Sequence, residues 1–129
     1  MNQQIIQKVY EAFNRKDYSA VLELFDRQME WFAAEHSPLA DQSPYRGVDQ
    51  IRKGVFDRIM QGFETLTVQV DEMIHNGNKV VALGYYHGLL KGKEKPFQAQ
   101  LAHVWTIHEN RIVKFQQYLD TYQVAQAMK

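Results

Sequence analysis

The chain has no cysteine, no net charge and no long apolar run, and each absence excludes a class of protein. Without cysteine it has no disulfide, thiolate nucleophile or cysteine metal site. Its 15 basic and 15 acidic residues cancel, which argues against nucleic acid or an anionic membrane surface as a partner. No segment reaches the roughly 18 apolar residues that a membrane span requires. The first ten residues lack the pattern of a signal peptide, so we expect a cytoplasmic protein.

Motifs that hold metals or organic cofactors are also missing. The histidines show no H-x-H or H-x-x-x-H spacing, which argues against a metal site. No glycine-rich loop precedes a helix, as a phosphate site would need, and no G-x-S-x-G elbow is present. We therefore expect neither a metal nor an organic cofactor.

The whole chain of 129 residues has the size of one domain, 1–129. Helical patterns dominate its first half. Apolar residues at helical spacing predict a helix around 5–13, and Asp17 is placed to cap a second short helix. A third helix is predicted from Val48 to Ile59, weakened by a glycine at 54 and ended by another at 62. Between them, 29–34 is predicted to be an isolated strand, and 35–47 a long loop that could serve as a lid.

Strand patterns fill the second half. Alternation predicts a strand at 66–71, and the Asn76-Gly77 pair predicts a hairpin turn leading into a strand at 79–86. Two further strands are expected at 97–107 and 112–119, followed by a weak helix. Three helices before four antiparallel strands indicate an α+β domain. Residues 80–86 are apolar on both faces, so the face without helices is expected to pair with a second copy in a homodimer.

The last two strands carry polar side chains among apolar ones. His103 and Trp105 share one strand face, since alternate side chains point the same way. By the same alternation Gln116, Tyr118 and Asp120 share a face, although Lys114 would then also point inward, which a bulge could resolve. We predict a hydrogen-bonded group of His103, Tyr118 and Asp120. The alternatives are that His103 is a satisfied core histidine and that Asp120 caps the final helix.

Three segments resemble the SnoaL-like, polyketide-cyclase-like branch of the NTF2-like superfamily: PYRGVDQI at 44–51, AHVWTI at 102–107 and RIVKFQQYLDT at 111–121. The resemblance extends over essentially the whole chain. It implies a cone-shaped barrel, in which a curved sheet and helices enclose a mostly apolar pocket, usually in a homodimer. It also implies that Asp120 is the general base and that His103 occupies a pocket position.

The function that this resemblance implies is isomerase, cyclase or lyase chemistry on a small apolar molecule, by proton abstraction next to a carbonyl. Asp120 would be the base, with His103 and Tyr118 polarising the carbonyl by hydrogen bonds. Two alternatives stay open: a non-catalytic ligand-binding or dimerisation module, and an epoxide hydrolase. The predicted substrate-binding residues are Trp105, Trp31, Tyr86, Phe13, Gln116 and His36.

Overall fold

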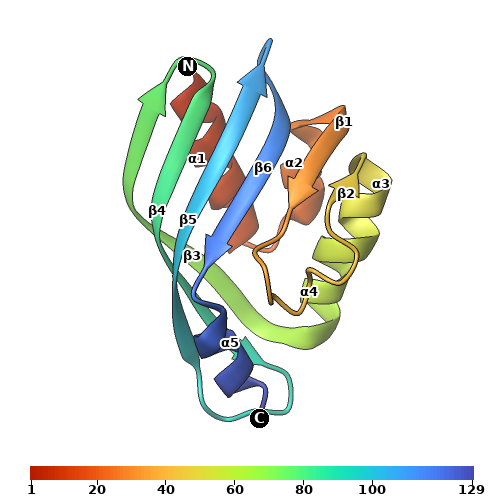
Figure 1. Cartoon of the computed structure of the whole chain (residues 1–129), viewed down its shortest axis with the longest axis vertical. Coiled ribbons are helices and arrows are strands. Elements are labelled where there is room, and N and C mark those ends of the chain that lie inside the picture. The colour runs from red at the N-terminus through yellow and green to blue at the C-terminus, as the bar shows by residue number, and fades with distance from the viewer.

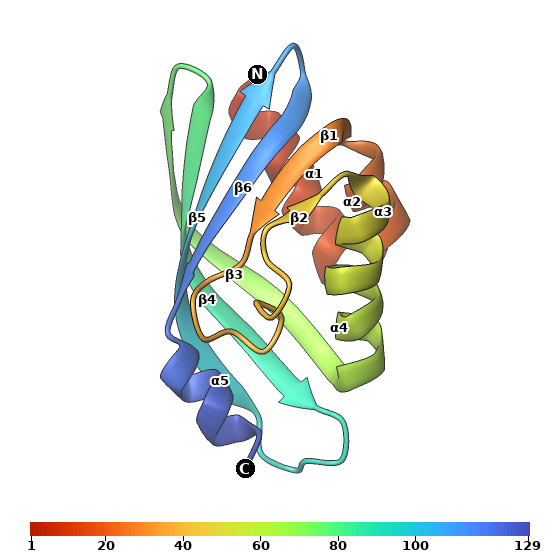
Figure 2. The same cartoon turned by 45° about the vertical axis from the view of Figure 1, so that its right-hand side comes forward.

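The computed structural model describes residues 1–129 and has the predicted α+β class, with a six-stranded curved sheet that is not closed (Figures 1 and 2). The helices are α1 (Asn2–Asn14), α2 (Tyr18–Glu23), α3 (Val48–Ile51), α4 (Asp57–Gly62) and α5 (Thr121–Ala127), with a π-helical turn η1 (Arg52–Phe56) between α3 and α4. The strands are β1 (Phe25–Phe32), β2 (Tyr45–Arg46), β3 (Phe63–Asn76), β4 (Lys79–Leu90), β5 (Phe97–His108) and β6 (Arg111–Leu119).

Helices α1 to α4 lie on one side of the sheet, and the core lies between them and the inner sheet face (Figure 2). Helix α1 buries Ile6, Val9, Tyr10 and Phe13 against the sheet, as the helical spacing predicted. The carboxylate of Asp17 accepts a hydrogen bond from the Ala20 N–H, which confirms it as the cap of α2. No helix is long and apolar enough to cross a membrane.

The predicted third helix is one continuous helical segment whose middle turn is wider than an α-helix. Gly54 lies in this turn, and an added Cβ there would meet the Tyr45 ring at 2.2 Å. The missing side chain therefore leaves room for a buried tyrosine from β2, the two-residue strand that was not predicted.

The sheet order is β2-β1-β6-β5-β4-β3. The prediction of an isolated strand at 29–34 is wrong, because β1 pairs in parallel with β6 and antiparallel with β2. Sequence alternation could not show this pairing, since β1 and β6 are far apart in the chain. The antiparallel β3-β4-β5-β6 meander is as predicted.

A bulge in β6 overturns the predicted facing of its side chains. Ile107 pairs with Ile112 but Thr106 with Lys114, so Val113 is an extra residue and the alternation shifts by one. Phe115 and Gln117 consequently point into the core, while Lys114 lies in solvent. Gln116 and Tyr118 therefore take the outer face, opposite to the prediction.

Candidate functional site

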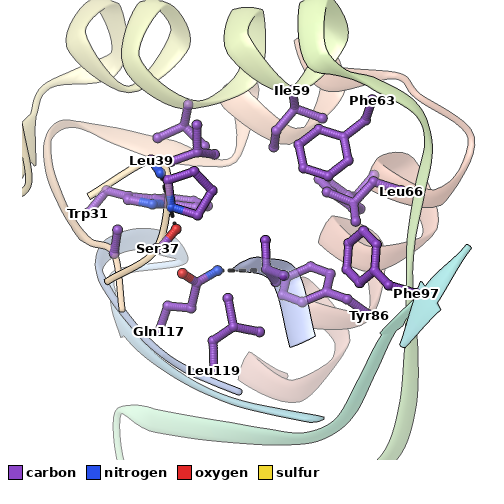
Figure 3. Close-up of a pocket in the computed structure, with 15 residues that line it drawn as sticks. Trp31, Ser37, Leu39, Ile59, Phe63, Leu66, Tyr86, Phe97, Gln117 and Leu119 are labelled. Carbon is purple, nitrogen blue, oxygen red and sulfur yellow. Dashed lines mark hydrogen bonds between the residues drawn. The ribbon is translucent and has the colours of Figure 1, made fainter. Parts of the chain in front are cut away.

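An apolar cavity lies between the inner sheet face, the α3–α4 segment and the loop that follows β1 (Figure 3). It holds about 60 Å³ of free space, enough for a few water molecules. A larger ligand would fit only if some of the lining side chains moved aside. The lining residues are Phe13, Trp31, Ala33, Ser37, Pro38, Leu39, Val55, Ile59, Phe63, Leu66, Tyr86, Phe97, Gln117, Leu119 and Val124.

Two buried polar side chains, Tyr86 on β4 and Gln117 on β6, meet on the cavity wall (Figure 3). The Gln117 Nε2 donates to the Tyr86 hydroxyl at 2.9 Å, and its Oε1 accepts from the Ala34 N–H at 3.1 Å. No charged side chain lines the cavity. A ligand there would meet mostly apolar surface, the Tyr86–Gln117 pair and the side chain of Ser37.

Behind this pair, His103 is only 2 % exposed and is hydrogen-bonded on both ring nitrogens. Its Nε2 lies 3.0 Å from the Tyr86 hydroxyl, and its Nδ1 lies 2.6 Å from the Tyr10 hydroxyl. The Trp105 indole N–H in turn donates to Tyr10 at 3.0 Å. Five side chains from α1, β4, β5 and β6 thus form one polar chain through an otherwise apolar core, and each of their buried polar atoms has at least one hydrogen-bond partner.

Burial sets the protonation states of these hydrogen-bonded side chains. Desolvation lowers the pKa of His103 to about 3, so the imidazole is neutral at physiological pH. Desolvation also raises the pKa of Tyr10 and of Tyr86, so both phenols keep their protons. A neutral histidine with such a low pKa is a weak base, and the two tyrosines are well suited to donate hydrogen bonds.

The loop between β1 and β2 forms one wall of the cavity through Ser37, Pro38 and Leu39. Arg58 on α4 holds it by donating to the Pro38 carbonyl at 3.0 Å and to the Asp41 carboxylate at 2.8 Å. The guanidinium lowers the pKa of Asp41. The Tyr45 hydroxyl donates to the Leu39 carbonyl at 2.7 Å. These bonds hold the loop between β1 and β2 in place as a wall of the cavity.

We expect Arg58→Lys to loosen this loop, because one ammonium group cannot reproduce the forked contacts of the guanidinium. The amides of Ala40 and Ser43, which bond within the loop, should exchange with solvent roughly 2- to 10-fold faster. Hydrogen exchange followed by NMR measures this. Arg52→Lys, outside the loop, is the matched control, and equal exchange in both variants would show that Arg58 does not hold the loop.

The structure brings together only some of the predicted site residues. Phe13, Trp31 and Tyr86 line the cavity, and Trp105 lies in the core behind it. His103 contacts the cavity through Tyr86. His36, by contrast, is exposed in the loop and does not line the cavity.

The prediction that His103, Tyr118 and Asp120 form one hydrogen-bonded group is wrong. Tyr118 is 58 % exposed on the outer sheet face, and Asp120 is exposed at the end of β6. Both lie beside an outer groove and away from the internal cavity. The bulge at Val113 is the reason, since it turns Gln117 instead of Tyr118 toward His103. Asp120 precedes α5 at the N-cap position, although its side chain makes no capping hydrogen bond.

Sequence reasoning missed Gln117 and gave Tyr10 no polar role. One signal for Gln117 was present, because a bulge was needed to keep Lys114 out of the core, and it brings Gln117 opposite His103. Nothing in the sequence pairs Tyr10 with residues more than ninety positions away. The structure brings no group of three or more His, Cys, Asp or Glu side chains together as metal ligands.

We expect Asp120→Asn to leave ligand binding in the cavity unchanged and the melting temperature within about 2 °C of wild type. The side chain is exposed, makes no capping bond and lies outside the cavity. Differential scanning calorimetry and a binding titration test both parts. A large loss of activity on a discovered substrate would instead restore Asp120 as the general base that the family resemblance implies.

A family model described as the SnoaL-like domain matches residues 6–115. The chain belongs to the SnoaL-like family. Among curated proteins, none matches the chain.

Solved structures place this SnoaL-like protein among NTF2-like folds. An NTF2-like protein from Burkholderia thailandensis is 33% identical, with a TM-score of 0.91 over 99% of this chain and 97% of the other. A proposed polyketide cyclase from Streptomyces antibioticus is 18% identical, with a TM-score of 0.81 over 99% and 98%. A protein with a ketosteroid isomerase-like fold from Catenulispora acidiphila, in complex with trimethylamine, is 22% identical, with a TM-score of 0.81 over 96% and 92%. The last two likenesses are evidence of the fold alone.

Proposed function

We propose that this SnoaL-like protein binds a small, apolar, carbonyl-bearing molecule in the internal cavity and acts on it as a cofactor-independent isomerase, cyclase or lyase. The supporting observation is the pair of hydrogen-bonded polar side chains, Tyr86 and Gln117, in a cavity that is mostly apolar and has no charged side chain. Apolar walls with a few well-placed polar groups are typical of small-molecule sites.

Hydrogen bonds from this pair would polarise a carbonyl and stabilise the negative charge that develops on its oxygen when a neighbouring C–H bond breaks. The electron pair of that bond would move into the enolate. No carboxylate lines the cavity, and His103 is a poor base, so the proton would pass to a water molecule or to a basic group of the substrate. Polarisation of the carbonyl is therefore the catalytic contribution that we propose for Tyr86 and Gln117.

The same lack of a base in the cavity favours the alternative function, a non-catalytic binding module. Both functions predict binding, but only the first predicts chemistry. An epoxide hydrolase fits less well, because it needs carboxylates flanking a water molecule and none lines the cavity.

Proton exchange separates the two functions. A panel of small apolar ketones would be incubated with the protein in D₂O, and the protons beside each carbonyl followed by NMR. The enzyme should accelerate their exchange, and Tyr86→Phe should reduce the rate by roughly 10²-fold, the scale for losing one such donor. Tyr122→Phe, on α5 and exposed outside the cavity, is the matched control. Binding without exchange would support the module, and a panel that does not bind would contradict both.

We further propose that the protein is a cytoplasmic homodimer that pairs through the outer sheet face, with no nucleic-acid or membrane partner. Val81, Leu83 and Tyr85 of β4 and Val104 of β5 lie on this face and are only half-buried in one chain. Contiguous apolar surface of this kind favours association.

Sedimentation velocity at micromolar concentration should accordingly give a dimer. Leu83→Lys should give a monomer, because a charge in the middle of an apolar interface would be desolvated. Lys79→Glu, at the first residue of the same strand, serves as a control for a change of charge alone. A monomeric wild-type protein would contradict the dimer.

A further inference from the structure

The polar chain behind the cavity, from Trp105 to Gln117, receives a hydrogen bond at each end from a group that can only donate. At one end, the backbone N–H of Ala34 donates to Gln117 Oε1. At the other, the indole N–H of Trp105 donates to the Tyr10 hydroxyl. Because both ends donate inward, one hydroxyl hydrogen between them, that of Tyr10 or that of Tyr86, is left without a protein acceptor.

At the Trp105 end, the hydroxyl hydrogen of Tyr10 cannot be donated to the indole N–H, which is itself a donor. The other neighbour of this hydroxyl is His103 Nδ1 at 2.6 Å, so Tyr10 donates and Nδ1 accepts. The neutral imidazole then carries its one proton on Nε2, which donates to the Tyr86 hydroxyl at 3.0 Å.

The reverse arrangement would be costly. If Nδ1 carried the proton, both neighbours of Tyr10 would be donors, and its own hydrogen would have no acceptor. Tyr10 is 6 % exposed, so this hydrogen would be buried and unpaired. Each tautomer leaves one hydroxyl hydrogen without a protein acceptor, that of Tyr10 if Nδ1 is protonated and that of Tyr86 if Nε2 is protonated. Tyr86 lines the cavity, where water or a ligand can accept its hydrogen, and Tyr10 does not, so the Nε2–H tautomer is favoured.

Starting from Ala34, the amide of Gln117 is oriented with its oxygen toward the backbone, and its Nε2 donates to Tyr86 at 2.9 Å. The Tyr86 oxygen thus accepts two hydrogen bonds, which leaves its own hydrogen without a protein acceptor. The second hydrogen on Gln117 Nε2 likewise has no protein partner. Both residues line the cavity (Figure 3).

We propose that Tyr86 and Gln117 form a receptor for one neutral acceptor oxygen, with Tyr86 directed toward the ligand by the Nε2–H tautomer of His103. This inference rests on the proposed function and narrows its ligand class. The two donors at this position select a ketone, aldehyde or ester oxygen. No cation lines the cavity to offset the desolvation of a carboxylate or phenolate, so charged ligands are disfavoured. His103 acts here as a positioning residue.

The tautomer can be measured in the free protein by ¹⁵N NMR of histidine-labelled protein, with His103 assigned through its proximity to the Tyr10 and Trp105 rings. The expected result is a proton on Nε2 and a bare Nδ1. A proton on Nδ1 would overturn the proposal, because Tyr86 would then donate to His103 and not to a ligand.

The receptor can be tested with two probes of nearly equal shape, 4-fluoroacetophenone and 4-fluoro-α-methylstyrene, which differ by a C=O in place of a C=CH₂. By ¹⁹F NMR titration, wild-type protein should bind the ketone about three- to tenfold more tightly. Tyr86→Phe should bind both equally, while Tyr122→Phe, at an exposed residue outside the cavity, should keep the preference. The carbonyl stretch of the bound ketone should also shift to lower frequency in wild-type protein, a measurement that needs no variant.

Equal binding of the two probes by wild-type protein, with an unshifted carbonyl stretch, would overturn the receptor while leaving the cavity as a binding site. Failure of both probes to bind would overturn the receptor and the proposed function together. The two failures are therefore distinguishable.

Discussion

Gly84→Ala is expected to lower the free energy of unfolding by about 3 kcal/mol, at the upper end of the range for overpacked sites. A Cβ at Gly84 would lie 1.8 Å from the backbone oxygen of Gln69 on the neighbouring strand. The obstacle is backbone, which cannot move aside as a flexible side chain can. Urea denaturation monitored by circular dichroism measures the change.

Gly62→Ala is the matched control, because a Cβ at the end of α4 would meet nothing within 4 Å. It should leave stability unchanged or raise it by about 0.4–1 kcal/mol, through the smaller entropy of the unfolded chain. Equal stability of the Gly84 and Gly62 variants would show that β3 can move away from β4 at this point.

The position of Gly84 also affects the site. It lies where the β3–β4 register shifts between Val70 and Glu72, a bulge at which the two long strands bend (Figure 2). Tyr86 follows two residues later on the same strand face. If the added methyl group pushes the strand outward at Gly84, the Tyr86 hydroxyl moves away from Gln117 and His103. The folded fraction of Gly84→Ala protein should therefore also bind ligand more weakly.

Most of the fold could be predicted from the sequence because its signals are local. The helical spacing of α1, the Asp17 cap and the hairpin turn near Asn76-Gly77 each act within a few residues, and the structure confirms the helix, the cap and the hairpin. The two turn residues are Gly77 and Asn78, because Asn76 still pairs with Lys79. The parallel pairing of β1 with β6 has no local signal, since the edge that a strand joins depends on the rest of the sheet. Alternation alone predicted β1 as isolated for this reason.

The candidate site was only partly predictable, and one extra residue accounts for most of the difference. Strict alternation along β6 turns Tyr118 inward, whereas the bulge at Val113 turns Gln117 inward. The family resemblance could not correct this, because a matching segment fixes the order of residues but not the face each one takes. His103 was correctly predicted to share a buried face with Trp105, since β5 has no such bulge near them.

Stability is expected to fall as the solution is acidified below pH 6.5, through His103. Burial lowers the pKa of His103 from 6.5 to about 3 in the folded protein, so the unfolded chain binds this proton first. Stability is therefore greatest above pH 6.5 and is lost at about 1.4 kcal/mol per pH unit as the pH falls toward 3. Between pH 7.5 and pH 5 this amounts to about 2 kcal/mol. Urea denaturation at several pH values measures the slope.

Two variants isolate the contribution of His103 from that of the carboxylates. His103→Gln should remove this slope whatever its absolute stability, because the amide does not titrate. His108→Gln should keep it, because the side chain of His108 is 72% exposed and outside the polar chain. If wild-type protein and His103→Gln lose stability in parallel between pH 7.5 and pH 5, the imidazole takes up its proton in the folded state. The hydrogen-bonded side chains that connect Trp105 to Tyr86 would then be accessible to solvent.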